Sequence, residues 1–283
     1  MLRCASIIFM IYYTEKGYPS FNHARKVACL SLEKTLNELN CKKGITELMF
    51  RDKWMKNMSE CDDVFADGWY SPPPMGVAVL SDNRVNFDSL RNPEYWSGNN
   101  EINWDGVLYA YASPVDRVSG YIGDISVTLY FGKNKKIIEH IKNCHEATTA
   151  LFECMSECST AGDLFWLSQR MFEKYHLKST VISRTDEMPI NLGHTFPSLA
   201  GANEKRQLSD EDKLNISLSR RFLNAEAEWG FDDGLQFTVE PQLISLDDPD
   251  MPKITQHYVV KYIDGDFVVC NDIDGILSRY SLI

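Results

Sequence analysis

The sequence predicts an α+β domain in which two helix pairs cover a curved antiparallel sheet. Residues 23–58 and 140–176 each follow the plan helix, break, helix, with apolar side chains at helical spacing. Strand-like segments follow both helix pairs, and Asp264-Gly265 between two of them is typical of a tight hairpin turn. Helix pairs alternating with antiparallel hairpins are typical of a sheet that carries its helices on one face.

The two helix pairs resemble each other in their breaks as well as in their apolar positions. Thr46 and Thr160 stand where the second helix of each pair begins, and an acidic residue follows each threonine. This arrangement predicts an N-cap at both places. Because the order of elements after each pair also matches, we interpret residues 1–283 as a single domain with two pseudo-repeat halves, about 23–132 and 137–270.

Several short apolar runs predict the strands of the sheet. They are residues 75–80, 107–112, 125–131, 180–183, 235–239, 257–263 and 267–270. A further apolar run, residues 5–13, is too short to span a bilayer and lacks a small-residue cleavage site after it, so we interpret it as a buried strand. The prolines at 72–74, with Tyr70, Tyr95 and Trp96 nearby, form either the wall of a pocket or a loop that only packs.

The composition and net charge limit which classes of molecule the protein is expected to bind. The 283 residues are 44% hydrophobic and carry a net charge of −11, which disfavours binding to nucleic acid or to an anionic membrane. A small-molecule substrate is the expected partner. The eight cysteines include no CxxC pair, and Cys154 and Cys158 have no second pair to complete a zinc site. We therefore expect free thiols and a cytoplasmic location. Four histidines on or beside helices are expected at the surface or in packing: His23, His140, His145 and His176.

Four segments in sequence order carry a resemblance to a known family. They are Gly120-Tyr121-Ile122-Gly123-Asp124, Asn191-Leu192-Gly193-His194, Phe237-Thr238-Val239-Glu240-Pro241 and Gln256-His257-Tyr258-Val259-Val260. Together they resemble the metal-site segments of the pita-bread superfamily, peptidase family M24, which includes methionine aminopeptidase, prolidase and creatinase. The resemblance covers nearly the whole chain and implies the pita-bread fold. A homodimer is plausible, as in much of the family.

The resemblance also implies which residues form the site. Asp124, His194 and Glu240 match three of the five ligand positions of the family's two-metal centre. The other two positions hold Ser113 and Gln256, with His257 beside the latter. These three, Ser113, Gln256 and His257, are possible auxiliary residues only, because serine and an amide are poorer ligands than carboxylates for a divalent metal.

Both histidines that serve the family's peptidases in catalysis are also replaced. Phe87 or Asp88 stands at the position before the first hairpin, and Gly201 stands at the position after His194. A two-metal peptidase needs bridging carboxylates and a group that transfers protons. Ordinary aminopeptidase activity is therefore not expected.

Three hypotheses follow for function. In the first, Asp124, His194 and Glu240 hold one Fe, Mn, Co or Zn ion in a hydrolase or oxygenase that acts on an amino-acid-like or natural-product molecule. In the second, His194 and Glu240 form a metal-free acid–base pair that cleaves a C–N bond, as in creatinase. In the third, the domain binds a ligand without catalysis. The sequence identifies neither the substrate nor the metal.

Overall fold

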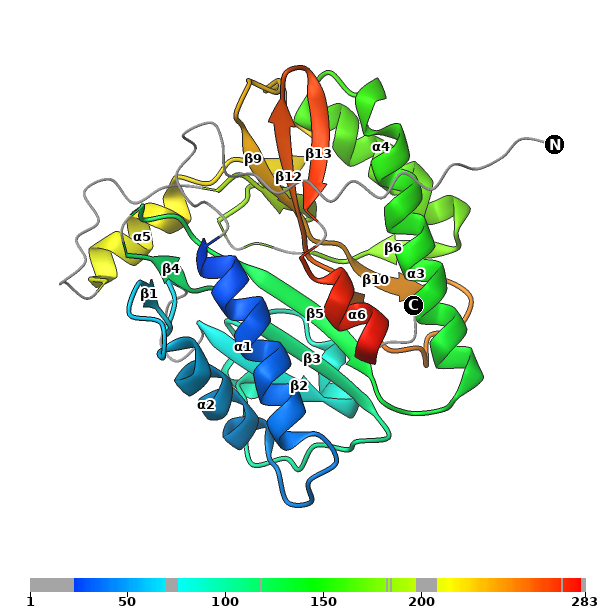
Figure 1. The fold of residues 1–283 in the computed structure, drawn as a ribbon. Coiled ribbons are helices and arrows are strands. Elements are labelled where there is room, and N and C mark those ends of the chain that lie inside the picture. Colours follow the sequence, from blue (N-terminus) through cyan, green and yellow to red (C-terminus); the bar gives the residue numbers. More distant parts are fainter. Residues whose placement is uncertain are drawn as a thin grey trace.

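A computed structural model describes residues 23–69, 76–117, 119–181, 183, 185–196, 208–270 and 272–280 (Figure 1). The strand expected at 5–13, the prolines at 72–74 with Tyr70, and Gly201 lie outside the described residues. No helix within the described ranges has the length and apolar character needed to cross a membrane.

The first half of the chain packs a helix pair on a three-stranded antiparallel sheet. Helices α1 (His23–Leu39) and α2 (Glu47–Met58) share an apolar core with this sheet, whose strand order is β2-β3-β5. The Thr46 side chain accepts a hydrogen bond from the backbone N–H of Met49, which confirms the predicted N-cap of α2. The strands of this half are β1 (Val64–Phe65), β2 (Val77–Ser81), β3 (Val107–Ala112), β4 (Val115–Asp116) and β5 (Ile125–Tyr130).

The second half contains the other predicted helix pair. Helices α3 (Lys135–Cys154) and α4 (Ala161–Lys174) meet at a capping box formed by Thr160 and Asp163, as the sequence predicts. Two three-stranded antiparallel sheets follow, with orders β11-β10-β6 and β13-β12-β9. Their strands are β6 (Leu177–Ser179), β9 (Gln236–Val239), β10 (Gln242–Ser245), β11 (Ile254–Thr255), β12 (Tyr258–Ile263) and β13 (Asp266–Cys270).

Backbone pairing connects the sheets and brings distant strand ends together. Val127 on β5 pairs with Gln256 just before β12, and Thr195 pairs with Phe237 on β9. Strand β7 (Asn191–His194) pairs with β8 (Phe222–Asn224). Figure 1 shows β5 running through the middle of the molecule toward the ends of β9 and β12. The chain around Asp124, His194 and Glu240 therefore converges on one region.

Most predicted elements are confirmed, and one strand is misplaced. The Asp264-Gly265 turn joins β12 to β13 with positive φ at both residues, as a two-residue hairpin requires. The strand expected at 180–183 lies instead at Leu177–Ser179, because the chain leaves the sheet after Thr180 and then lines a pocket with Val181 and Ser183. Helices without a sequence prediction are α5 (Asp210–Leu218), α6 (Asp274–Tyr280) and the 3-10 turns η1 (Asp82–Asn86), η2 (Pro93–Tyr95) and η3 (Met155–Glu157).

The cysteines of the described residues agree with the expected thiol state. Free thiols are present at Cys29, Cys41, Cys61, Cys144, Cys154 and Cys158.

Candidate metal centre

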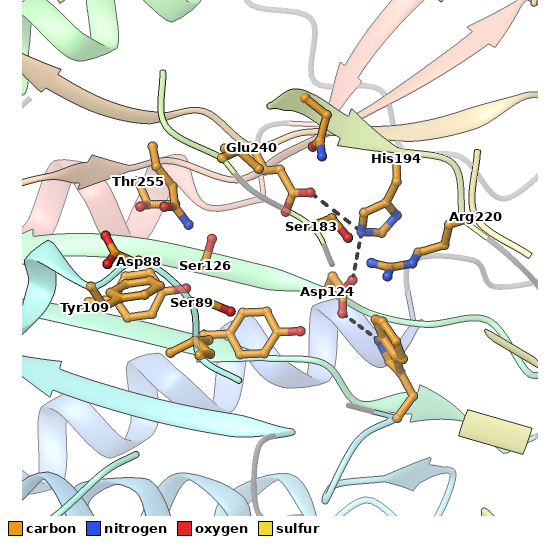
Figure 2. Close-up of a pocket in the computed structure, with 17 residues that line it drawn as sticks. Asp88, Ser89, Tyr109, Asp124, Ser126, Ser183, His194, Arg220, Glu240 and Thr255 are labelled. Atoms are coloured by element: carbon orange, nitrogen blue, oxygen red, sulfur yellow. Dashed lines mark hydrogen bonds and ion pairs between the residues drawn. The ribbon is translucent and has the colours of Figure 1, made fainter. Parts of the chain in front are cut away.

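A pocket opens where β5 begins and where β7 and β9 end. Asp124 directly precedes β5, His194 is the last residue of β7, and Glu240 directly follows β9. All three side chains line a cavity of about 670 Å³, a volume that includes solvent at its mouth. Figure 2 shows the three side chains pointing toward one another from separate strands. We refer to Asp124, His194, Glu240 and the adjoining His257 as the pocket cluster.

Asp124 is held from two sides. Its Oδ1 accepts a hydrogen bond of 3.0 Å from the indole Nε1 of Trp69. Its backbone carbonyl accepts one from the buried guanidinium of Arg25 in the first turn of α1. The preceding residue must be glycine, because a Cβ at Gly123 would lie 2.4 Å from the backbone nitrogen of Arg25. The Gly123-Asp124 pair is therefore fixed by the packing of α1 on β5.

His194 presents one defined ring nitrogen to the pocket. Its Nδ1 lies 2.9 Å from the carbonyl oxygen of Thr195, and a carbonyl only accepts, so Nδ1 carries a proton. Its Nε2 faces two carboxylates, 3.5 Å from Oδ2 of Asp124 and 3.6 Å from Oε1 of Glu240. Gly193 lets β7 approach β9, because a Cβ there would lie 2.2 Å from the carbonyl oxygen of Thr238.

Glu240 links His194 to His257. Its Oε2 lies 3.6 Å from Nδ1 of His257, and its Oε1 accepts a hydrogen bond of 3.3 Å from the hydroxyl of Thr238. Burial raises the pKa of Glu240, and the negative charge of Asp124 raises it further. The neighbouring His194 and Arg220 act in the opposite direction. Glu240 therefore holds a proton more readily than an exposed glutamate.

His257 is an uncharged imidazole at neutral pH. The side chain is fully buried, and neither ring nitrogen has a hydrogen-bond partner within the described part of the chain. Burial lowers its pKa well below the ordinary value, and the neighbouring Arg25 and His194 lower it further. A neutral imidazole next to a carboxyl group of raised pKa is a suitable pair for passing a proton.

The remaining two predicted residues do not join these contacts. Ser113 is buried, and its hydroxyl donates a hydrogen bond of 3.3 Å to the carbonyl oxygen of Gly76. Gln256 is also buried, and neither atom of its amide has a hydrogen-bond partner among the described residues. Asp116 does not replace Ser113 as a ligand, because its carboxylate accepts hydrogen bonds from the backbone and hydroxyl of Ser119.

Arg220 is a pocket residue that sequence reasoning missed. Its guanidinium carbon lies 4.7 Å from the ring centroid of Trp69 and 5.1 Å from that of Phe222. Its Nη2 donates a hydrogen bond of 2.8 Å to the hydroxyl of Thr185. Arg220 follows a helix that lacks any motif, so no local signal marked it. Phe87 and Asp88 also line the cavity, in the region where the resemblance expected a catalytic histidine to be replaced.

The donor set fits one divalent metal and does not fit two. No anionic donor for a second ion comes from Ser113 or from the amide of Gln256, the two positions where the resemblance places further ligands. One imidazole nitrogen and two carboxylates suit a single Fe, Mn, Co or Zn ion. Their ligand atoms do not all lie within 4.8 Å of one another, so the Asp124 and Glu240 side chains would have to draw closer around such an ion.

Comparison with known proteins identifies the family. The model of metallopeptidase family M24 matches residues 21–262. Among solved structures, methionine aminopeptidase from Rickettsia prowazekii is similar with a TM-score of 0.60 and 14% identity, over 91% of this chain and 97% of that one. X-Pro aminopeptidase from Thermotoga maritima gives a TM-score of 0.58 and 12% identity, over 88% of this chain and 59% of that one. Prolidase from Pyrococcus furiosus gives a TM-score of 0.55 and 15% identity, over 87% of this chain and 62% of that one.

The chain thus spans about three fifths of the length of the X-Pro aminopeptidase and the prolidase. The comparison with curated proteins found no significant match. At such low identity the structural likeness establishes the fold, which is the pita-bread fold that the sequence predicts. Because the family model matches most of the chain, this protein belongs to metallopeptidase family M24.

Proposed function

We propose that this M24 protein is a diverged hydrolase that acts on a small amino-acid-like molecule and uses one divalent metal instead of two. The observation that carries the proposal is the orientation of His194. Its Nδ1–H is bound to the carbonyl of Thr195, so Nε2 offers its lone pair between the carboxylates of Asp124 and Glu240. Metal-binding histidines are commonly fixed in this way through their other nitrogen.

Asp124, His194 and Glu240 would hold the ion, which supplies a polarised carbonyl or an activated water. The protein itself contributes a route for a proton. Glu240, whose pKa is raised, lies 3.6 Å from the neutral His257. Glu240 and His257 can therefore share the proton that hydrolysis moves from water to the leaving group. This pair would take the place of the family's missing catalytic histidines.

The polar groups at the two ends of the pocket support an amino-acid-like substrate. Figure 2 shows Arg220 and Asp88 on opposite sides of the cavity. Arginine binds a carboxylate with two parallel hydrogen bonds, and an aspartate accepts an ammonium group. Phe87, Tyr109 and Tyr111 also line the cavity and provide aromatic surface. A molecule with a free carboxylate and an amino group fits this distribution of charge.

A metal-free mechanism of the creatinase type is the second candidate. The same contacts favour it, because Nε2 of His194 can carry a proton between the two carboxylates in place of a metal. Glu240 and His194 would then act as an acid–base pair. The comparisons give no support to the oxygenase alternative, since the matching solved structures are peptidases.

Calorimetric titration of chelator-treated protein with Mn²⁺ tests the proposal. Mn²⁺ is chosen because it prefers oxygen and nitrogen donors to thiolate. We expect one site in the wild type and none in Asp124→Ala, whereas His176→Gln binds normally because His176 lies in an exposed pair with Asp247. If the wild type binds none of Mn²⁺, Fe²⁺, Co²⁺ and Zn²⁺ at the pocket, the proposal of a single divalent metal is overturned.

Turnover assays separate the candidates. Dipeptides and N-acylated amino acids, each with a free or an amidated carboxylate, form the substrate panel. We expect metal-dependent hydrolysis that prefers the free carboxylate, and a raised KM in Arg220→Met for those substrates only. Hydrolysis that survives chelation and is lost in His194→Ala would instead favour metal-free chemistry. Ligand binding without turnover, with or without metal, would favour a binding domain.

A further inference from the structure

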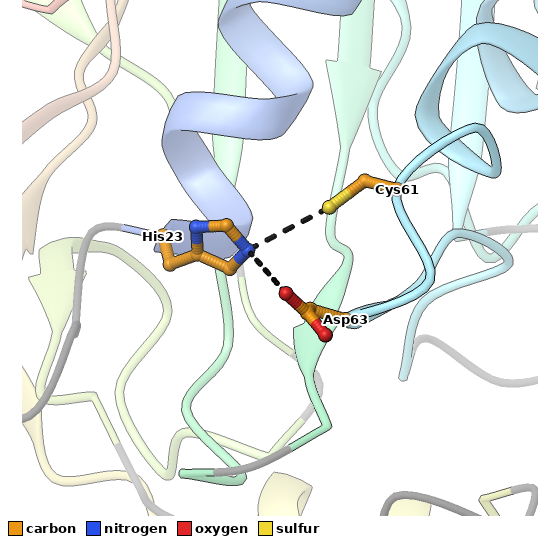
Figure 3. Close-up of side chains that lie close together, drawn as sticks. All are labelled: His23, Cys61 and Asp63. Carbon is orange, nitrogen blue, oxygen red and sulfur yellow. Dashed lines mark hydrogen bonds and ion pairs between the residues drawn. The ribbon is translucent and has the colours of Figure 1, made fainter.

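A second group of ligand-type side chains lies outside the pocket. His23 is the first residue of α1, and Cys61 and Asp63 belong to the connection between α2 and β1. The Nε2 of His23 lies 3.7 Å from Sγ of Cys61 and 3.9 Å from Oδ2 of Asp63 (Figure 3). Among the described residues, this is the group of His, Cys, Asp and Glu whose ligand atoms all lie within 4.8 Å of one another. We call it the surface cluster.

Ordinary hydrogen bonding explains this arrangement poorly. The distance of 3.9 Å between His23 and Asp63 exceeds that of a hydrogen bond, and a thiol is a weak donor to nitrogen. The side chains of His23 and Asp63 are 32% and 66% exposed, so an ion pair between them gains little. Nevertheless, Cys61 and Asp63 both face the same nitrogen atom, as Figure 3 shows.

The backbone holds both parts of the surface cluster in place. The turn that carries Cys61 is closed by a hydrogen bond of 3.1 Å from the Cys61 N–H to the carbonyl of Met58. The carbonyl of Asp63 accepts a hydrogen bond of 2.8 Å from the backbone N–H of Arg117. On the other side, Arg25 anchors the start of α1 through a buried ion pair with Asp272. The three ligands are therefore positioned before any ion binds.

We propose that His23, Cys61 and Asp63 form a binding site for Zn²⁺, separate from the pocket. Imidazole, thiolate and carboxylate are the three donor types that zinc takes in proteins, and tetrahedral coordination places such donors about 3.4–3.8 Å apart. The separations of 3.7 and 3.9 Å at Nε2 match this spacing with little movement. The thiolate disfavours Mg²⁺ and Ca²⁺, which require oxygen donors.

The bound ion would join two segments far apart in sequence. It would tie the start of α1 to the connection between α2 and β1, the two segments that carry the surface cluster in Figure 3. The fourth position faces solvent and would hold water. Because binding requires the folded arrangement of all three ligands, Zn²⁺ should raise the unfolding temperature. The sequence did not predict this site, since its ligands have none of the spacings of known zinc motifs.

Cobalt spectroscopy tests the proposal independently of the pocket. A thiolate bound to Co²⁺ gives a charge-transfer band in the near ultraviolet. No cysteine is among the described residues that line the pocket, so these residues cannot produce the band. We expect one equivalent of Co²⁺ to produce the band in the wild type, and Zn²⁺ to abolish it by displacement. Cys61→Ser should remove the band, and His23→Gln should weaken Co²⁺ binding at least tenfold.

The matched control is Cys41→Ser, because Cys41 is exposed and contacts only the side chain of Asn40 at 3.4 Å. Circular dichroism of each variant verifies that it is folded. Absence of the band in the folded wild type would overturn the proposal. So would a band that persists in Cys61→Ser, which would direct attention to Cys144 beside His140. A rise in unfolding temperature with Zn²⁺ in the wild type, absent in Cys61→Ser, is expected as the second readout.

Discussion

The pocket cluster and the surface cluster combine similar side chains in opposite surroundings. The side chains of Asp124 and His194 are 3% and 4% exposed, whereas those of His23 and Asp63 are 32% and 66% exposed. In the pocket, charged side chains depend on fixed donors such as the indole of Trp69. At the surface, water stabilises them. The pocket therefore depends on the integrity of the fold, while the surface cluster would depend on the ion that we propose for it.

The largest effect is expected at Arg25, which lies between the two clusters. Its guanidinium pairs with Asp272 and donates to the backbone carbonyls of Asp124 and His257. Arg25→Met leaves these acceptors and Asp272 without their partner, so the free energy of unfolding should fall by about 3–5 kcal/mol. Urea denaturation measures this change. A shift as small as that in Arg279→Met, whose partner Glu33 is exposed, would contradict it.

The stability of the metal-free protein should depend on pH through His257 and Glu240 of the pocket cluster. The pKa of His257 is lower in the folded protein than its ordinary value of 6.5, so the unfolded chain binds the extra proton first as the pH falls. The free energy of unfolding should therefore decrease as the pH falls below 6.5, and it should decrease more steeply in the wild type than in a variant without His257. For Glu240 the sign is opposite: its raised pKa means that stability falls as the pH rises above 4.5 toward the folded-state value.

Urea midpoints between acid and neutral pH, measured with chelator, check this prediction. The slope below the ordinary histidine pKa should become shallower in His257→Asn. It should not vanish, because burial also lowers the pKa of His140. His176→Gln is the control, since that side chain is exposed. Equal slopes in the wild type and in His257→Asn would show that His257 is not buried uncharged.

A smaller effect is expected when a single donor in the pocket is removed. Trp69→Phe keeps an aromatic ring beneath Arg220 but removes the N–H that binds Oδ1 of Asp124 at 3.0 Å. A buried acceptor that loses its donor costs about 1–3 kcal/mol. Thermal unfolding should show this loss, and Mn²⁺ should restore part of it if Asp124 is a ligand. If Mn²⁺ restores none of the lost stability, the assignment of Asp124 as a metal ligand is weakened.

The smallest effect is expected at the surface cluster without metal. Cys61→Ser in zinc-free protein should change the free energy of unfolding by less than about 0.5 kcal/mol, because its contacts are weak and partly exposed. Only when Zn²⁺ is added should the variant and the wild type differ. A large loss of stability without zinc would mean that Cys61 serves the packing of the domain instead of an ion.

Much of the pocket could be predicted from the sequence because three of its residues stand at the ends of strands. Asp124, His194 and Glu240 could be predicted from short segments whose glycines the packing requires, as Gly123 and Gly193 show. The alternation of helix pairs and hairpins likewise predicted the fold. Those features depend on residues that are close together along the chain, so they can be recognised in the sequence alone.

The parts that could not be predicted depend on segments that meet only in the folded chain. Arg220 reaches the pocket from the turn after α5 by lying over Trp69, a contact between residues far apart in sequence. His23 meets Cys61 and Asp63 only because α1 packs beside the end of α2. The strand at 180–183 was misplaced because Val181 and Ser183 line the pocket instead of continuing the sheet.

The neutral amide of Gln256 would limit how much positive charge the proposed metal site can accept. Asp124 and Glu240 contribute two negative charges and His194 none, so one divalent cation leaves the site electrically neutral. Changing the Gln256 amide to a carboxylate alters its shape very little but adds a third negative charge at a buried position, where the amide has no hydrogen-bond partner among the described residues. With Ser113→Asp as well, four charges would match two divalent cations. The double variant should therefore tolerate, and require, a second ion, while the natural chain is neutral with one.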